Sequence, residues 1–510
     1  MFAIFFTKHQ TASQAMAKQQ TIKHNNAVYS SPYYSTCLTV ITFVFIVFCA
    51  FIFISSASAA TLATANNSNT AIKTLSLQHA INYAQQNDPW LKGNQHQQQA
   101  IESLSNAAAT LPDPKMSLGL NNLPTDGFDF SQEGMTQVKV GISQMFARGD
   151  SLAIKKQQLH LSSEAYPYLR QDRSAQVAVT VGSLWLDAFK AQQSIALIEK
   201  NRALFDQLTD IAQINYASTA GKTRQQDIIR AQLELTRLEE RLDTFAGQQS
   251  KYHGMMSPWL TPFEVESLAT QPNVAFEQQG MFTLSSTLPD ISLLKPELVQ
   301  SKQWLSATQL AQQFANHPAV FALNKKIASN KTGISLAEQA YKPEWGVNAS
   351  YGYRDDTPSG ASRSDFFSVG VTFDLPLFTE NKQNMAVKSA ISQTESVKTE
   401  KILLLRQLIA SFNSAKGRFL RIQTRKSLYQ TQLLPQIHDQ AEAALSAYTN
   451  DDGDFAEVVR ARIAVLNAEI DHINLLVEEQ KLILALNYLF IAQKTSVTNQ
   501  PSLAALGENS

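Results

Sequence analysis

Charged residues recur in a short pattern that occurs twice in the chain. The first copy reads Asp227-Ile228-Ile229-Arg230-Ala231 and the second reads Glu457-Val458-Val459-Arg460-Ala461. An acid and an arginine three residues apart lie on one face of a helix, so each copy can form an ion pair within its own helix. Two roles are open for these four charges. They are either exposed turn charges worth well under about 1 kcal/mol each, or groups that gate a passage or dock a partner.

Each charged pattern follows a turn. Tyr216 stands five residues before Gly221, and Tyr448 stands five residues before Gly453, with long helical sequence on either side of both. Each copy therefore predicts a tight turn that joins two helices at the tip of a hairpin. The second tip also contains a set of three acids: Asp451, Asp452 and Asp454. This set is either a solvated acidic turn or, in several assembled copies, a field that attracts cations or a basic protein surface.

Other residue patterns give no sign of an enzyme. The sequence contains no nucleophile elbow, phosphate-binding loop or HExxH zinc motif, so we expect no catalysis and no cofactor. His253, Met255 and Met256 invite a copper interpretation, but the neighbouring glycine and proline favour a loop with ordinary packing. His472 falls in an apolar helical seam, where a packed histidine is expected. The sequence therefore predicts no metal site.

The N-terminal segment has the pattern of a secretory signal. Residues before 38 contain three lysines and no acids, residues 38–54 are apolar, and Ala57 and Ala59 follow as a cleavage pattern. We predict a signal peptide over residues 1–59. The alternative is a single membrane anchor, because seventeen apolar residues approach the lower limit for spanning a bilayer.

Cleavage changes two properties of the chain. Both cysteines, Cys37 and Cys49, lie in the leader, so the mature protein would have no disulfide and no thiolate metal site. Phe48 is too bulky for a typical lipidation site at Cys49. The whole chain has 43 basic and 43 acidic residues, and loss of three lysines leaves a formal charge of −3. This balance gives no argument for a nucleic-acid partner.

Hydrophobic periodicity predicts the same order of elements twice. In the first half it predicts a helix over 76–109, strands over 115–121 and 137–143, and a long helix from about 149 to 216. A helix of that length would be about 100 Å long. After the first tip, a coiled-coil seam steps by three and four residues. The seam is Ile228, Ala231, Leu235, Leu238, Leu242 and Phe245.

The second half predicts a helix over 305–339, strands over 345–353 and 367–375, a long helix over 381–448, and a final helix to about 493. The repeat period is about 230 residues, which indicates duplication. The predicted parts after the leader are a first repeat over 60–252, an irregular linker or equatorial segment over 253–300, a second repeat over 301–493, and a polar tail over 494–510.

Each predicted strand has one face of large apolar residues and one of small or polar residues. The polar candidates for a lumen are Ser117, Asn121, Lys139, Ser143, Asn348, Ser350, Ser368 and Thr372. This alternation is typical of a membrane β-barrel with a wet interior, and also of a soluble sheet packed on one face. Four strands cannot close a barrel, and an open edge is not stable in lipid. A barrel would therefore need several chains, and three chains would supply twelve strands.

The order of elements, the duplication and the two tips together resemble the TolC family of outer-membrane efflux channels over about residues 75–493. The segments Leu111-Pro112-Asp113-Pro114-Lys115 and Asn121-Asn122-Leu123-Pro124 resemble its heavy-metal (CzcC-like) branch. The resemblance implies a mainly helical protein that forms a homotrimer, with a twelve-stranded barrel in outer-membrane lipid on a twelve-helix periplasmic tunnel. It also implies two partners: a periplasmic adaptor (membrane fusion) protein and an inner-membrane RND-type pump.

The resemblance further implies that the tips form the periplasmic aperture. Well-known members carry acids near the second tip; Glu457 matches one, and Arg460 stands in the place of another. The expected function is passive export of metal cations or small toxic compounds through an outer-membrane duct that extends into the periplasm. The alternative is a soluble periplasmic coiled-coil adaptor or scaffold.

Overall fold

The computed structural model describes residues 74–217, 224–260, 283–450 and 453–491. The chain divides into two units, residues 1–69 and 70–510, and all described residues belong to the second. The predicted leader, Gly221, Asp451, Asp452 and the predicted tail lie outside the described residues. Among the helices that are described, none combines the length and the apolarity needed to cross a membrane.

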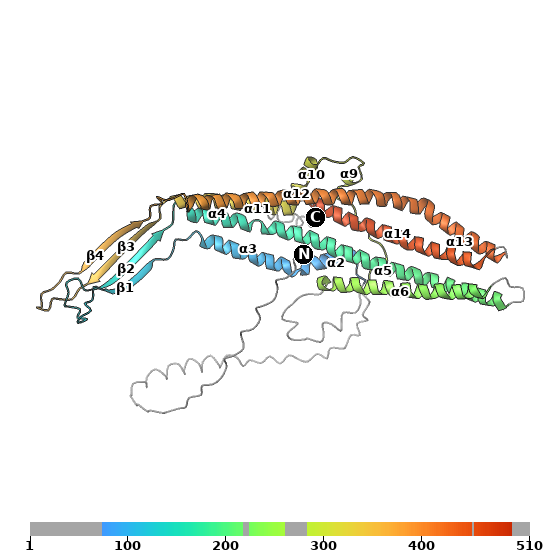
Figure 1. Cartoon of the computed structure of the whole chain (residues 1–510), viewed down its shortest axis with the longest axis horizontal. Coiled ribbons are helices and arrows are strands. Elements are labelled where there is room, and N and C mark those ends of the chain that lie inside the picture. Colours follow the sequence, from blue (N-terminus) through green and yellow to red (C-terminus); the bar gives the residue numbers. More distant parts are fainter. Residues whose placement is uncertain (1–73, 218–223, 261–282, 451–452, 492–510) are drawn as a thin grey trace, which may run out of the picture. The chain divides into compact units, whose positions relative to one another are not determined.

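The first repeat contains two strands between helices (Figure 1). Its elements are α2 (Leu77–Asn87), α3 (Pro89–Ala107), β1 (Lys115–Asn121), β2 (Gln137–Phe146), α4 (Ser151–Ser163), α5 (Tyr166–Ala217) and α6 (Gln225–Leu260). The helix α6 runs past residue 253, where the sequence predicts an irregular segment, and includes Pro258 near its end. His253, Met255 and Met256 consequently lie in a helix, and the prediction of a loop there is wrong.

The second repeat follows the same order. Its elements are α9 (Pro296–Val299), α10 (Ala307–Phe314), α11 (Pro318–Glu338), a short 3₁₀ turn (Gln339–Tyr341), β3 (Trp345–Tyr353), β4 (Phe366–Phe373), α12 (Gln383–Leu428), α13 (Leu434–Thr449) and α14 (Phe455–Leu489). The predicted mainly helical class with four strands is confirmed.

Two helices predicted as continuous are each divided in two by a proline. Pro89 begins α3, and the side chain of Asp88 accepts a hydrogen bond from the Trp90 amide at 3.0 Å. Pro318 begins α11 in the same way, with His317 as its N-cap. Proline has no N–H to give to the preceding turn, so it is favoured at the first position of a helix and ends the one before it.

Proline also explains a local widening in the second long helix. A five-residue π-helix over Tyr429–Leu433 separates α12 from α13, and Pro435 lies in the first turn of α13. The ring of an interior proline clashes with the carbonyl four residues earlier, and an extra residue in the turn relieves that clash. The first long helix is instead divided before Tyr166, leaving α5 with 52 residues, a length of about 78 Å.

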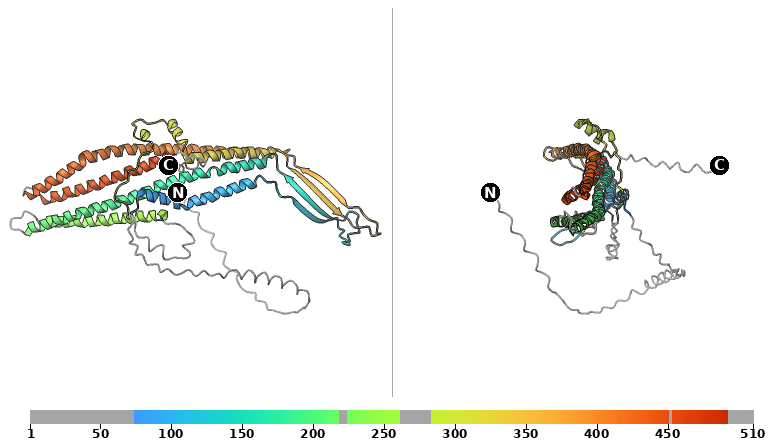
Figure 2. Two further views of the ribbon diagram at one scale, coloured as in Figure 1. Left: turned by 180° about the vertical axis from the view of Figure 1, so that it is seen from behind. Right: turned by 90° about the vertical axis from the view of Figure 1, so that its right-hand side faces the viewer.

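The helices of the two repeats share their cores. Figure 1 and the left view of Figure 2 show α5 beside α6 and α13 beside α14, with the end of α5 and the start of α14 away from the strands. One apolar cluster joins the hairpins. Its buried members are Ile198, Phe205, Leu208, Ala231, Leu238, Phe455, Val458, Val459 and Leu466. Neither hairpin can therefore bury its apolar face without the other.

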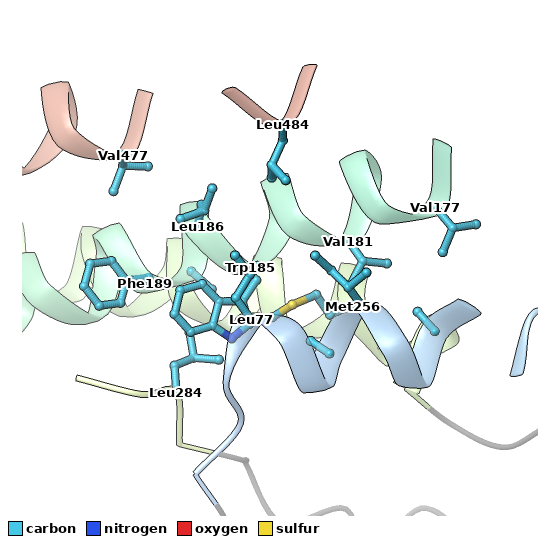
Figure 3. Packing of buried hydrophobic residues seen from close by; sticks show 14 residues of the cluster. Leu77, Val177, Val181, Trp185, Leu186, Phe189, Met256, Leu284, Val477 and Leu484 are labelled. Atoms are coloured by element: carbon cyan, nitrogen blue, oxygen red, sulfur yellow. The ribbon is translucent and has the colours of Figure 1, made fainter. Parts of the chain in front are cut away.

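A second cluster lies midway along the helices around Trp185 (Figure 3). The indole is fully buried, stacks on Phe189 with ring centroids 5.5 Å apart, and donates a hydrogen bond from Nε1 to the Leu75 carbonyl at 3.0 Å. Leu77 from α2 and Met256 from α6 belong to the same cluster, as the figure shows. The cluster fixes the start of the first repeat against α5.

The four strands form one antiparallel sheet in the order β1-β2-β3-β4. The central pair joins the two repeats, because β2 belongs to the first and β3 to the second. In the described residues, the outer edges of β1 and β4 have no strand partner. An unpaired edge presents free N–H and C=O groups that can pair with another chain.

Candidate functional site

One face of the sheet is apolar from edge to edge and exposed. The register aligns side chains of this face in rows, such as Leu118, Val140, Tyr351 and Phe367. Leu118 is 76% exposed and Phe367 is 73% exposed. A soluble monomer rarely exposes so continuous an apolar surface, so this face requires an apolar environment or a partner.

The opposite face carries every polar residue predicted to line a lumen. Its central row is Ser117, Gly141, Ser350 and Ser368. The row toward the helices is Lys115, Ser143, Asn348 and Gly370, and the row toward the connecting loops is Gly119, Lys139, Gly352 and Phe366. Asn121 and Thr372 lie at the two ends of this face. The register therefore brings all eight predicted residues to one surface.

All five glycines of the strands lie on this polar face: Gly119, Gly141, Gly346, Gly352 and Gly370. Neighbouring side chains cover several of them. A Cβ at Gly141 would lie 2.8 Å from Ser117 Oγ, and one at Gly370 would lie 2.8 Å from Asn348 Oδ1. A Cβ at either position would require the end of the neighbouring side chain to move. The glycines thus let side chains of adjacent strands lie across the polar face.

Charged residues fasten the helix-proximal end of the sheet. Arg148, just after β2, contacts the carboxylate of Asp374, just after β4, and lies 3.7 Å from Glu344. It also donates a hydrogen bond to the Lys342 carbonyl at 3.0 Å. The neighbouring Gly149 has a φ of +47°, a conformation that favours glycine. These contacts tie the end of β2 to the segments that flank β3 and β4.

Two arginines fasten the loops at the other end. Arg354 donates to the Gly134 carbonyl at 3.0 Å, and its guanidinium lies 3.9 Å from the centroid of the Phe366 ring. Arg363 donates to the carbonyls of Ser131 and Glu133 at 3.2 and 3.3 Å. The β3–β4 loop of the second repeat is thereby hydrogen-bonded to the β1–β2 loop of the first repeat.

The first helical tip uses its acid as a cap. Asp227 is only 5% exposed, and its carboxylate accepts a hydrogen bond from the Arg224 amide at 2.9 Å. Arg224 directly precedes α6 and Asp227 is the third residue of that helix, so the acid satisfies a free N–H at the helix start. Among the ion pairs of the described residues, none joins Asp227 to Arg230. The predicted pair is therefore absent here, because the carboxylate turns inward to cap the helix.

The second tip forms the predicted pair. Glu457 and Arg460 approach to 2.5 Å, and their side chains are 47% and 66% exposed. The capping role belongs instead to Asp454, which accepts a hydrogen bond from the Ala456 amide at 3.2 Å. Gly453 is held close to the preceding helix: a Cβ there would lie 2.6 Å from the Tyr448 backbone nitrogen. The glycine of this tip is therefore required by a close approach.

The two tips also differ in how they bury apolar residues. In the second copy Val458 and Val459 are both buried, whereas Ile229 of the first copy is 57% exposed. The ring of Phe455 packs edge-on against Tyr448 with centroids 5.6 Å apart. The duplicated sequence pattern thus gives one tip with a packed apolar face and one tip with an exposed isoleucine.

The residues considered for copper do not converge. Met256 is fully buried in the Trp185 cluster, while Met255 is 48% exposed. Burial lowers the pKa of the neighbouring His253. No group of three or more His, Cys, Asp or Glu side chains with metal-binding geometry occurs in the part of the chain that the structure describes.

The structure reveals one buried polar cluster that sequence reasoning did not identify. His317 accepts the Ala319 amide at Nδ1 (3.3 Å), and its Nε2 lies 3.2 Å from the Tyr488 carbonyl. Since Nδ1 accepts, the ring proton is on Nε2, which donates to that carbonyl. The Tyr488 hydroxyl donates to Asp172 at 2.8 Å. Burial lowers the pKa of His317 and raises the pKa values of Asp172 and Tyr488.

A second unpredicted contact fixes the segment before α10. Lys416 is almost fully buried, and its Nζ donates to the carbonyls of Leu298 and Gln303 at 2.9 and 2.7 Å. The ammonium also lies 5.1 Å from the centroid of the Trp304 ring. Burial lowers the pKa of this lysine. No local sequence signal identifies such a residue, because its partners lie more than one hundred positions away.

Comparison with known proteins shows the fold. No protein-family model and no curated protein matches the sequence. A CusC crystal structure that concerns transmembrane channel formation has 12% identity and a TM-score of 0.62, over 82% of this chain and 92% of that one. The CmeC outer-membrane channel of Campylobacter jejuni has 12% identity and a TM-score of 0.62, over 81% and 85%.

The outer-membrane protein VceC of Vibrio cholerae has 14% identity and a TM-score of 0.59, over 81% of this chain and 96% of that one. Likenesses at 12–14% identity establish a shared architecture. The chain has the fold of these outer-membrane channel structures.

Proposed function

We propose that the chain is the outer-membrane exit duct of a tripartite efflux system and a member of the TolC family. In this proposal three copies share one twelve-stranded barrel in outer-membrane lipid, and their helices form a tunnel in the periplasm. The duct conducts solutes passively, and an inner-membrane RND-type pump supplies the driving force through a periplasmic adaptor.

One observation carries the proposal most directly. The sheet has an exposed apolar face, a polar face rich in glycine, and two open edges. Lipid satisfies the apolar face, water the polar face, and pairing of β1 with β4 of the next copy satisfies the edges. A soluble adaptor would leave the apolar face uncovered.

The helical tips are the proposed periplasmic mouth. Glu457 and Arg460 form an exposed ion pair beside Gly453 and Asp454, and Arg230 and Ile229 are exposed at the other tip. Three copies of an acid–arginine pair give a mouth of mixed charge. We infer that such a mouth docks an adaptor through mixed charge, in place of a purely acidic ring.

The test is the state of the protein in the cell envelope. Outer membranes extracted with mild detergent should yield heat-resistant trimers, and deletion of the gene should lower tolerance to exported compounds. Metals, drugs and detergents should be tested side by side, because the proposed duct role does not specify the exported compound. Recovery as a soluble periplasmic monomer would support the adaptor or scaffold alternative and overturn the proposal.

A further inference from the structure

The polar face of the sheet has an unusual charge distribution. The four strands contain two charged residues, and both are lysines: Lys115 and Lys139. The register places both on the polar face. Lys139 pairs with Gly119, which lies four residues after Lys115 along β1. At about 3.4 Å per residue, the two lysine rows lie roughly 14 Å apart, on either side of the serine-rich central row.

Neither lysine is neutralised by a neighbour. Among the described residues no ion pair involves Lys115 or Lys139, and the strands contain no Asp or Glu. The cross-strand partners of Lys139 are Gly119 and Gly352, so no side chain directly opposite competes for its ammonium group. A third cation, the guanidinium of Arg354, lies over the ring of Phe366 in the same row. The backbone amide of Arg354 donates a hydrogen bond to the Asp365 carboxylate.

Acidic residues lie beyond the ends of the strands. At the helix-proximal end, Asp374 and Glu344 are already engaged by Arg148, and the exposed Asp113 stands two residues before Lys115. The connecting loops carry a set of six acids: Asp126, Asp129, Glu133, Asp355, Asp356 and Asp365. Charges beyond a Debye length of about 8 Å in physiological salt are largely screened. On the polar face itself, the charges of the strands nearest the central row are therefore those of the two lysines.

We propose that this face forms a cationic lumen that favours anionic solutes and disfavours metal cations, with Lys139 and Lys115 as the residues that determine this preference. The inference rests on the proposed function, since it needs three copies to enclose the face. Six lysines and no strand acid then line one passage. The cargo best suited to it is an anionic solute.

The charge preference can be measured at a single introduced thiol. Cys37 and Cys49 are replaced by alanine in the full-length chain, and Ser117→Cys is added between the two lysine rows. Trimers are treated with membrane-impermeant thiosulfonates, one anionic and one cationic, and the ratio of their reaction rates reports the local potential. Lys139→Gln should lower the anionic-to-cationic ratio about threefold in 0.15 M salt, and more than tenfold in 0.01 M salt.

Two controls separate the inference from the proposed function. Lys388→Gln removes the same charge from an exposed position on α12 and should leave the ratio unchanged. Leu118→Cys lies next to Ser117 on the opposite face and should resist both reagents if lipid covers it. Equal reactivity of Leu118→Cys and Ser117→Cys would overturn the barrel itself. A protected Leu118→Cys with a ratio unaffected by Lys139→Gln would overturn only the cationic lumen.

Discussion

A single arginine placed on either face of β4 should distinguish a membrane barrel from a soluble sheet. Val369 lies mid-strand on the apolar face and is 64% exposed. Arginine at the lipid-facing midplane of a barrel costs about 2–4 kcal/mol. Since three copies would each carry the change, Val369→Arg should destabilise the assembled trimer by roughly 6–12 kcal/mol.

The matched control is Ser368→Arg, one residue away on the polar face. Its side chain would point into water and carry no lipid cost. The assay is the amount of heat-resistant trimer in outer membranes at equal expression, because each 1.4 kcal/mol changes an equilibrium about tenfold. We expect Val369→Arg to abolish the trimer and Ser368→Arg to preserve it. Normal assembly of Val369→Arg, or equal loss in both variants, would refute the assignment of the faces.

Three further changes test individual contacts. Gly453→Ala should displace the second tip, because a Cβ has no room beside the preceding helix, and should raise hydrogen exchange there; unchanged exchange would contradict the close approach. Trp185→Phe removes the donor to the Leu75 carbonyl and should destabilise the fold by about 1–3 kcal/mol in urea titration; no loss would show that the bond is dispensable. Burial lowers the pKa of His317, so the unfolded chain binds the proton more readily, and the stability from the neutral ring is present above about pH 6.5 and declines below it. We therefore expect hydrogen exchange at the Ala319 amide, which His317 accepts, to rise in acid. His317→Asn keeps an N-cap acceptor and should abolish this rise, whereas persistence of the rise would assign it to another group.

The strands could be predicted closely because alternation is a strong local signal. The ranges 115–121 and 345–353 agree with β1 and β3, and both faces of each strand follow from period two. The pairing order could not be predicted in this way. The β2–β3 pair joins residues about two hundred positions apart, and nothing local in either strand specifies that partner.

The helices were harder to divide correctly. Asp88-Pro89 and His317-Pro318 contain the signals that end one helix and begin the next, but apolar periodicity continues across both and hides the break. The tips show a different limit. Asp227 and Glu457 occupy equivalent positions in the duplicated pattern, yet one caps a helix and the other pairs with arginine. Only the packing around each tip decides between these roles.

The central claim is that three copies close one barrel, and edge-strand cross-linking tests it most directly. In the background without Cys37 and Cys49, Ser117→Cys on β1 is combined in turn with cysteine at 366, 368, 370 and 372 on β4. One or two adjacent β4 positions should form disulfides between copies, giving products that stop at a trimer on a non-reducing gel. Absence of cross-links at every position, or a ladder that extends beyond three copies, would contradict a closed trimeric barrel.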